Sequence, residues 1–269
     1  MTYQLKKVKV HDDIVSITVE DEETERKYRI LLRDYLEHPL SDQKQLSEDD
    51  IKRLDEQHTY CYAYLKCIRK LSLRDQSEKE LNDLLDDVFG LSSAGKEQIM
   101  ASLKSQGLVN DENVAASQLF TDQNKLLGRK KTLYNLLDRG IARSLAQRII
   151  DEVDEKQELA RGIQRGQRII QHYKNKSQRQ QKNQLYQQLI VAGYDNPDEI
   201  IACLDLPFDE EKEEENLKRD LAKALVRYKH KYSGRQLYQH VYQHLLTKGY
   251  QSAMIQSCYR KEGEEYEDQ

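Results

Sequence analysis

The chain of 269 residues contains no tryptophan, three phenylalanines, three prolines and eleven glycines. Because proline and glycine interrupt helices, their scarcity beside abundant Glu, Lys, Gln and Leu favours a helical fold. No apolar run approaches the roughly eighteen residues that a membrane-spanning helix requires, so no transmembrane segment is expected. The first residues also lack the apolar stretch of a secretory signal, and we expect a cytoplasmic protein.

The four cysteines form no CxxC pair, and Cys61 and Cys67 lie six residues apart on a predicted helix. This spacing places the two thiols on different faces, so neither a disulfide framework nor a cysteine metal site is expected. His240 and His244 have a spacing that can bind a metal, but no third ligand is evident, which favours ordinary surface histidines. No Ser–His–Asp or Cys–His combination stands out. We therefore expect no catalytic residues, no metal and no cofactor.

A helical pattern recurs along the chain and ends each time in a glycine followed by a large apolar residue. Its copies end at Gly140, Gly193 and Gly249, which are 53 and 56 residues apart. In each copy, apolar residues one turn apart form a single stripe, and the glycine can adopt the left-handed conformation that ends a helix. An imperfect earlier copy ends at Gly90. The repetition predicts a modular helical array, and such arrays usually bind large partners.

The N-terminal residues follow a different pattern. Apolar and polar residues alternate within residues 3–32, which predicts two or three short strands that pack on the following helix. Ser47 and Ser77 have the sequence context of helix N-caps. The expected fold class is therefore mainly α, an elongated tandem array of three-helix repeats with a small N-terminal β element. The predicted divisions are a β element and loop at 1–46, helical repeats at 47–108, 109–155, 156–206 and 207–260, and an acidic tail at 261–269.

The net charge of −4 argues against a general nucleic-acid-binding protein, but the charges are unevenly distributed. Residues 125–182 hold fifteen Lys or Arg and six Asp or Glu, whereas residues 196–220 hold three and ten. The acids that begin the helix near residue 209 complement its dipole or contact a basic partner. Gly162 and Gly166 lie in the basic stretch without the strand–turn–helix context of a phosphate loop, and we expect them to loosen or kink their helix.

The basic stretch supplies the candidate partner-binding residues. Two interpretations remain open: a surface that meets DNA phosphates or acidic partner residues, or a solvated helix surface paired with nearby acids. Most tyrosines are expected to pack with their hydroxyl groups at the surface and not to form a base-stacking platform. The candidates are Arg129, Lys130, Lys131, Arg139, Arg143, Arg148, Arg161, Arg165, Arg168, Lys176, Arg179 and Lys182.

Several stretches together resemble one protein family. They are Tyr62-Ala63-Tyr64-Leu65 with Ser77-Glu78-Lys79-Glu80-Leu81, Gly107-Leu108-Val109-Asn110-Asp111, Leu127-Gly128-Arg129 with Arg139-Gly140-Ile141, and residues 179–201. This set resembles the RecX family, bacterial regulators of the RecA recombinase, over most of the chain. The N-terminal strands and the fourth repeat resemble longer members from low-GC Gram-positive bacteria. The family usually carries Lys-Gly-Pro where this chain has Leu127-Gly128-Arg129, and an aromatic residue at the position of Val114.

The resemblance implies a non-enzymatic protein that binds the RecA–DNA filament and restrains its ATPase activity and strand exchange. It thereby implies a role in DNA repair, recombination and the SOS response. The implied partners are the RecA filament and DNA, within that filament or weakly on its own; we expect a monomer without a membrane partner. Our hypothesis is that the middle repeats dock on the filament, so that reversing Arg129, Lys130 and Arg168 together weakens inhibition. The alternative is a sequence-nonspecific nucleic-acid-binding protein that acts without RecA.

Overall fold

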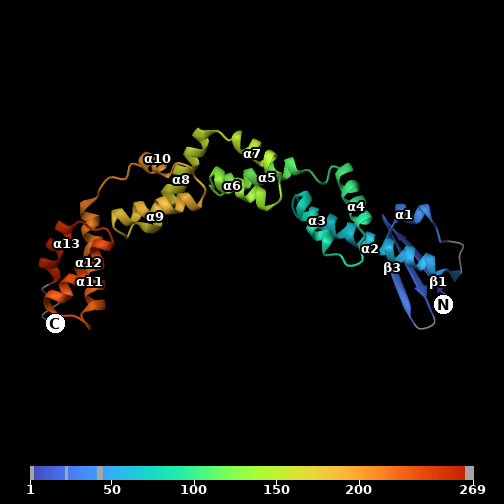
Figure 1. The fold of residues 1–269 in the computed structure, drawn as a ribbon, viewed down its shortest axis with the longest axis horizontal. Coiled ribbons are helices and arrows are strands. Elements are labelled where there is room, and N and C mark those ends of the chain that lie inside the picture. Colours follow the sequence, from blue (N-terminus) through green and yellow to red (C-terminus); the bar gives the residue numbers. More distant parts are fainter. Residues whose placement is uncertain (1–2, 22–23, 41–44, 264–269) are drawn as a thin grey trace. The chain divides into compact units, whose positions relative to one another are not determined.

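The computed structural model describes residues 3–21, 24–40 and 45–263, and side chains as far as residue 261 (Figure 1). Most of the predicted acidic tail at 261–269 therefore lies outside the described residues. The chain divides into two compact units, Met1–Gln118 with Asn135–Gln147 and Leu119–Tyr134 with Arg148–Gln269. Helices dominate both units and a small sheet stands at the N-terminal end, which confirms the predicted fold class. The division into four repeats stays a prediction.

The first unit begins with an antiparallel sheet of order β3-β2-β1-β4. The alternation that predicted strands is explained by the buried face, where Val15, Ile17 and Val19 are at most 1% exposed. Two elements were not predicted, the short helix α1 and the two-residue strand β4. The elements are β1 (Tyr3–His11), β2 (Ile14–Glu20), β3 (Glu25–Leu31), α1 (Leu32–Glu37) and β4 (Gln45–Leu46).

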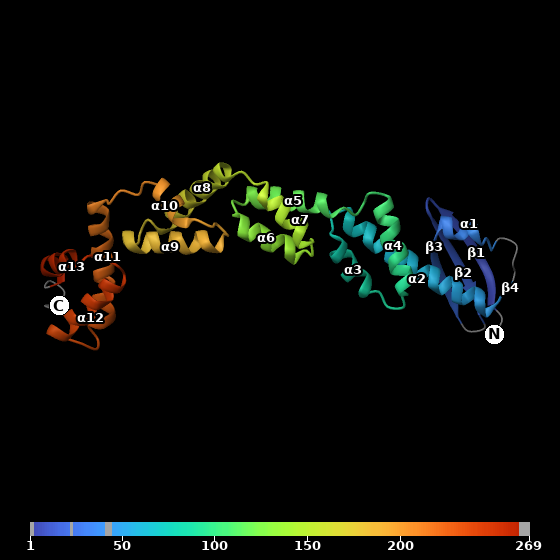
Figure 2. The same ribbon diagram turned by 45° about the horizontal axis from the view of Figure 1, so that its top comes forward.

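The long helix α2 (Glu48–Leu71) serves two hydrophobic cores of the first unit. Its first half packs Ile51 and Leu54 into the core of the sheet, and its second half packs Ala63 and Cys67 against α3 (Glu78–Asp86) and α4 (Ser93–Ser105). Figure 2 shows α2 running from the sheet to these two helices. The predicted strands therefore lean on the first long helix, as expected.

Three further helices, α5 (Asp111–Asn124), α6 (Arg129–Asp138) and α7 (Arg143–Asp151), contribute residues to both units. The second unit continues with two groups of three helices. They are α8 (Glu155–Tyr173), α9 (Gln178–Val191) and α10 (Pro197–Cys203), then α11 (Glu210–Tyr228), α12 (Gly234–Thr247) and α13 (Ser252–Cys258), which a π-helical turn, η1 (Tyr259–Gly263), extends.

Close packing accounts for two glycines in the second unit. Helix α8 runs from Glu155 to Tyr173 as one element that includes Gly162 and Gly166. A Cβ atom at Gly162 would lie 2.5 Å from Ile200, and one at Gly166 would lie 2.6 Å from Leu204. These glycines let α10 and the residue after it approach the helix closely.

The glycines of the repeated pattern end their helices as predicted. Gly140, Gly193 and Gly249 have φ angles of 81°, 88° and 92°, in the left-handed region that favours glycine. In each case the following residue donates its backbone N–H to a carbonyl five residues earlier, over 3.0, 3.1 and 3.3 Å. This is the hydrogen-bond pattern of a Schellman cap, and it satisfies carbonyl groups that the helix end would otherwise leave free.

Each of these capping glycines also packs against the start of another helix, and we call these three contacts junctions. In the first junction, Gly140 packs on Lys79 while the Ser77 hydroxyl donates to the carbonyl of Arg139 over 2.5 Å. In the second, Gly193 packs on Lys131 while the backbone N–H of Gly128 donates to the carbonyl of Ala192 over 2.8 Å. In the third, Gly249 packs on Arg179 while the Ser177 hydroxyl donates to the carbonyl of Lys248.

A carboxylate completes each junction by accepting the first backbone N–H of the packed helix. Asp111 accepts from Glu78, Glu158 accepts from Arg129, and Glu213 accepts from Gln178, each over 2.9 Å. The negative charge also lies at the positive end of the helix dipole. The repeated sequence pattern therefore corresponds to a repeated contact, each one within a single unit of the structure.

Candidate partner-binding surface

Two of the predicted binding residues are held inside the junctions. The Arg139 guanidinium lies in the first junction, 13% exposed, and donates to both oxygens of Glu80 over 3.1 and 2.9 Å and to the carbonyl of Asp75 over 2.7 Å. The Arg129 guanidinium lies in the second junction and forms an ion pair with Glu158, whose side chain is 11% exposed. Both guanidinium groups are therefore committed to contacts within the chain.

The hydrogen bonds that Glu80 accepts lower the pKa of its carboxyl group. Burial disfavours the charged carboxylate, but hydrogen bonds from the Arg139 guanidinium, the Ser77 backbone and the Arg74 guanidinium outweigh burial and lower the pKa to about 2. The carboxylate is charged at neutral pH, which matches the cation beside it. This arrangement is a structural ion pair at the start of a helix. The Arg139 guanidinium uses its N–H donors within the chain and has little capacity to bind a partner.

Four further candidates have partners but keep exposed surface. Lys130 forms an ion pair with Asp195 over 2.6 Å while its side chain remains 68% exposed. The ammonium groups of Lys131 and Lys176 lie over the rings of Tyr134 and Tyr173, at 4.5 and 5.0 Å from the ring centroids. Arg165 donates to the carbonyls of Lys125 and Leu126 over 3.1 and 3.2 Å.

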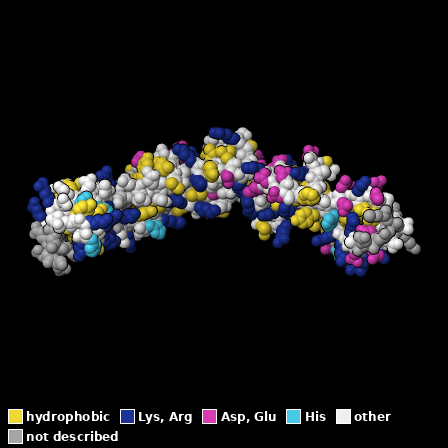
Figure 3. Space-filling model, turned by 60° about the horizontal axis from the view of Figure 1, so that its bottom comes forward, with side chains coloured by type: hydrophobic (Ala, Val, Ile, Leu, Met, Phe, Trp, Pro, Cys, Tyr) yellow, Lys and Arg dark blue, Asp and Glu magenta, His cyan; other side chains and the backbone are white. Residues whose placement is uncertain are grey.

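The remaining candidates divide by exposure. Arg161 is half-buried. Burial raises the pKa of the Tyr194 hydroxyl, and the positive charges of Arg165 and Arg161 oppose that rise. The others lie at the surface of their helices, Arg143 in the first unit and the rest in the second. On the face drawn in Figure 3, Lys and Arg side chains are interspersed with other side chains over both units. The exposed candidates are Arg143, Arg148, Arg168, Arg179 and Lys182.

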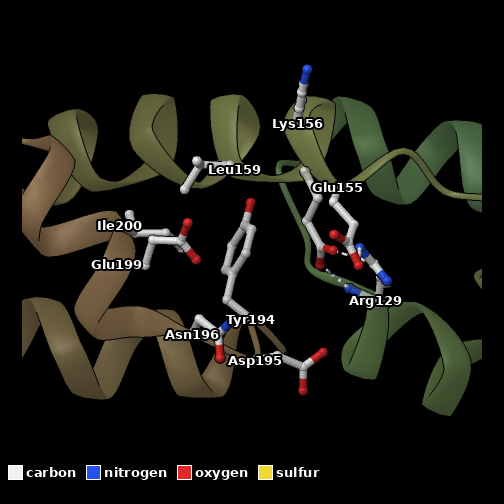
Figure 4. A pocket seen from close by; sticks show the side chains of 10 residues that line it. Arg129, Glu155, Lys156, Leu159, Tyr194, Asp195, Asn196, Glu199 and Ile200 are labelled. Atoms are coloured by element: carbon white, nitrogen blue, oxygen red, sulfur yellow. Dashed lines mark hydrogen bonds and ion pairs between the residues drawn. The ribbon is translucent and has the colours of Figure 1, made fainter.

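A pocket of about 300 Å³ adjoins the second junction (Figure 4). The Tyr194 ring stands in it between α8 and α10, and its hydroxyl donates to the carbonyl of Leu126 over 3.0 Å. Burial raises the pKa of this hydroxyl to about 12, which keeps it a donor at physiological pH. The lining carries four carboxylates, Glu155, Glu158, Asp195 and Glu199, and two cations, Arg129 and Lys156. The basic character of residues 129–131 is therefore locally offset by acids.

Sequence reasoning missed a second group of cations, in α11 and α12. The charge count over residues 196–220 covered the acidic start of α11 and ended before most of the basic residues that follow it. From 216 to 260 the chain holds nine Lys or Arg and a single acid, Asp220. A count that began at residue 216 identifies this segment from the sequence alone.

In the described part of the chain, no helix has the length and apolar character to cross a membrane. Among the described residues, no three His, Cys, Asp or Glu side chains gather into a metal site. His240 stacks on Tyr232 at 3.8 Å between ring centroids, and His244 meets the edge of Tyr228 at 5.8 Å. The two histidines therefore belong to an aromatic cluster.

The fold and its surface define a helical-repeat protein with exposed cations. Residues 211–258 match the family description RecX, third three-helix domain, within the predicted fourth repeat. Regulatory protein RecX of Clostridioides difficile (strain 630) is 27% identical over 195 residues, covering 71% of this chain and 89% of the relative. Regulatory protein RecX of Streptococcus pneumoniae serotype 19F (strain G54) is 27% identical over 230 residues, covering 82% and 86%.

A solved structure shares the fold. The crystal structure of a regulatory protein RecX superposes with a TM-score of 0.56 at 17% identity, covering 75% of this chain and 98% of that one. The family-model match and the similarity to regulatory proteins RecX over most of the chain support a RecX family protein.

Proposed function

We propose that this protein inhibits the RecA recombinase by binding the RecA–DNA filament and restraining its ATP hydrolysis and strand exchange. The observation that carries the proposal is the similarity to regulatory proteins RecX over 71% and 82% of the chain. The protein acts by binding and without catalysis of its own. It works as a monomer in the cytoplasm, where RecA and DNA are present.

The proposed binding surface consists of the exposed cations of the second unit. DNA phosphates and acidic residues of a filament attract such cations at long range, and several weak contacts made together give a stable complex. Arg168 and Lys182 represent this surface, because both side chains are exposed. Arg129 and Arg139 are excluded from it because their guanidinium groups are held in junctions. The four predicted repeats are the proposed modules of the array, joined at the three junctions.

The test is single-stranded-DNA-dependent ATP hydrolysis by the cognate RecA, with this protein added below stoichiometry. We expect strong inhibition and no ATP hydrolysis by this protein alone. In the double variant Arg168→Glu/Lys182→Glu, the concentration for half-inhibition should rise about tenfold, if each lost contact contributes about 0.7 kcal/mol. Lys7→Glu/Lys9→Glu is the matched control, since it makes the same charge change at exposed positions of β1.

The alternative function is sequence-nonspecific nucleic-acid binding without RecA, which the basic segment 216–260 favours. The two functions are separated by measuring both activities in parallel. Absence of any effect on RecA, together with tight binding to free DNA at physiological salt, would replace the proposed function by the alternative.

A further inference from the structure

A pocket of about 680 Å³ lies in the first unit and includes none of the predicted binding residues. Three helices line it: α1 with Asp34 and Glu37, α2 with Glu56 and Tyr60, and α4 together with the turn that precedes it. A pocket of this volume can hold a small molecule or a few side chains of a partner. The groups that line it indicate which of these it suits.

The Arg33 guanidinium of this pocket is already committed to contacts within the chain. It donates to the hydroxyl groups of Tyr60 and Ser102 over 3.0 and 3.3 Å and lies 3.4 Å from the carboxylate of Asp34. It also lies over the rings of Tyr60 and Tyr64, 5.9 and 5.6 Å from their centroids. Arg33 therefore joins α1 to α2 and α4, and it leaves little positive charge to attract an anion.

The carboxylates of the pocket outnumber this cation. Asp34, Glu37 and Glu56 all line the pocket, and Glu37 and Glu56 are exposed, so their charges are open to a partner. Burial raises the pKa of Asp34, Arg33 opposes the rise, and the negative charge of Glu37 adds to it. A cationic group in the pocket would offset this repulsion between carboxylates. The pocket therefore suits a positively charged ligand.

Two exposed apolar side chains adjoin the lining residues in the chain. Leu36, between Asp34 and Glu37 in α1, is 66% exposed, and Phe89, directly before the lining residue Gly90, is 100% exposed. A fully exposed phenylalanine gains no burial from its own fold, and aromatic side chains are enriched where proteins contact one another. This combination of carboxylates and large apolar groups favours a polypeptide ligand.

The charge of the surrounding sequence has the same sign as the pocket. Residues 1–118 hold seventeen Lys or Arg and twenty-four Asp or Glu, a balance of −7. This balance attracts a positively charged partner at long range and repels an acidic one. The charge of the first unit and the charge of its pocket therefore select the same class of partner.

We propose that this pocket is a docking site for a basic polypeptide segment of another protein. A lysine or arginine of that segment enters the pocket between Asp34, Glu37 and Glu56, and a neighbouring apolar residue of the segment packs on Phe89. The apolar contact distinguishes the segment from a free polyamine, which carries ammonium groups without a large apolar side chain. The site does not depend on the proposed action on RecA, since none of its residues belongs to the proposed binding surface of the second unit.

The test uses the full chain and a short fluorescein-labelled peptide in which lysines alternate with leucines, followed by anisotropy at about 50 mM salt. Glu37→Lys/Glu56→Lys should weaken binding about tenfold or more, because each substitution replaces an attraction by a repulsion. Glu37→Asp/Glu56→Asp keeps both charges and should bind like the unaltered chain. Phe89→Ser should weaken binding severalfold without changing its dependence on salt.

The matched control is Asp13→Lys/Asp83→Lys, which makes the same charge change at two exposed residues of the first unit that do not line the pocket. Equal weakening by both double variants would overturn the proposal in favour of a net-charge effect, as would unchanged binding by Glu37→Lys/Glu56→Lys. Equal binding of a peptide with glutamates in place of the lysines would also overturn it.

A competition experiment separates the two sources of ammonium groups. Unlabelled peptide should displace the probe at lower concentration than spermidine does. Displacement by spermidine at equal concentration, together with unchanged binding by Phe89→Ser, would overturn the docking site in favour of a polyamine site. RecA inhibition by Glu37→Lys/Glu56→Lys should equal that of the unaltered chain, so this second assay separates failure of the docking site from failure of the proposed function.

Discussion

The junctions make a quantitative prediction about four capping glycines. Gly193 and Gly107 both have positive φ angles, 88° and 68°, so replacing either by alanine introduces left-handed strain of about 1–2 kcal/mol. Their surroundings differ. A Cβ atom at Gly107 meets nothing within 4 Å, whereas one at Gly193 falls less than 3.0 Å from the backbone of Lys131 at the start of α6. Backbone atoms cannot swing aside as the end of a side chain does.

We therefore expect Gly107→Ala to lower stability by the strain alone and Gly193→Ala to cost about 1–3 kcal/mol more through overpacking. The total for Gly193→Ala is about 2–5 kcal/mol. Gly249→Ala should be intermediate, since the atoms nearest its Cβ would belong to the Arg179 side chain, at 2.8 Å and beyond. Gly140→Ala, which meets the Lys79 side chain at closer range, should fall between Gly249→Ala and Gly193→Ala.

The assay is urea unfolding followed by far-ultraviolet circular dichroism, with hydrogen exchange on α6 and α9 to locate the loss. Gly193→Ala should increase exchange at both helices, because the junction holds them together, whereas Gly107→Ala should leave them unchanged. Equal destabilisation by Gly193→Ala and Gly107→Ala would refute the reasoning, since the left-handed strain would then account for both losses and overpacking against Lys131 for none. Retained protection of α6 in Gly193→Ala would refute it as well.

Two further predictions concern acid stability and thiol reactivity. The folded pKa of Glu80, about 2, lies below its ordinary value of 4.5, so the ion pair stabilises the fold above about pH 4.5 and this contribution is lost as the pH falls toward 2. Glu80→Gln should therefore flatten the acid side of a curve of unfolding free energy against pH. An unchanged curve would contradict the contact between Glu80 and Arg139. Of the four cysteines, only Cys203 is exposed, and burial raises the pKa of Cys61 and Cys67 to about 11, so a thiol-reactive disulfide reagent should modify one thiol per native chain quickly and all four after unfolding.

The helices were predictable because the signals that define them are local. The Ser77 capping box and the positive-φ glycines act within a few residues, and the structure contains them where the sequence predicts them. The strands were predictable for the same reason, since alternation is read along one strand. The short elements α1 and β4 were missed. Strand β4 depends on a tertiary contact, since Gln45 and Leu46 pair with Gln4 and Tyr3 of β1.

The candidate surface was less predictable, because a charge in the sequence carries no information about its partner. The acids that hold Arg139 and Arg129 lie 59 and 29 residues away along the chain, so only the fold identifies these two arginines as structural. The opposite error affected α11. Its first turns are acidic and its later turns are basic, and the charge count over residues 196–220 ended before Lys223 and Arg227.

The departure from the family pattern at Leu127-Gly128-Arg129 has a physical explanation in the second junction. A Cβ atom at residue 128 would lie within 3.0 Å of the Gly193 backbone, so the glycine of the pattern is required here. The residue that follows is Arg in place of the usual Pro, and its backbone N–H donates to Glu158 over 2.9 Å, a bond that proline lacks the hydrogen to make. Its guanidinium pairs with the same carboxylate. Arg129 and Glu158 thus form a matched pair, in which the charged side chain at residue 129 offsets the cost of a buried acid at residue 158.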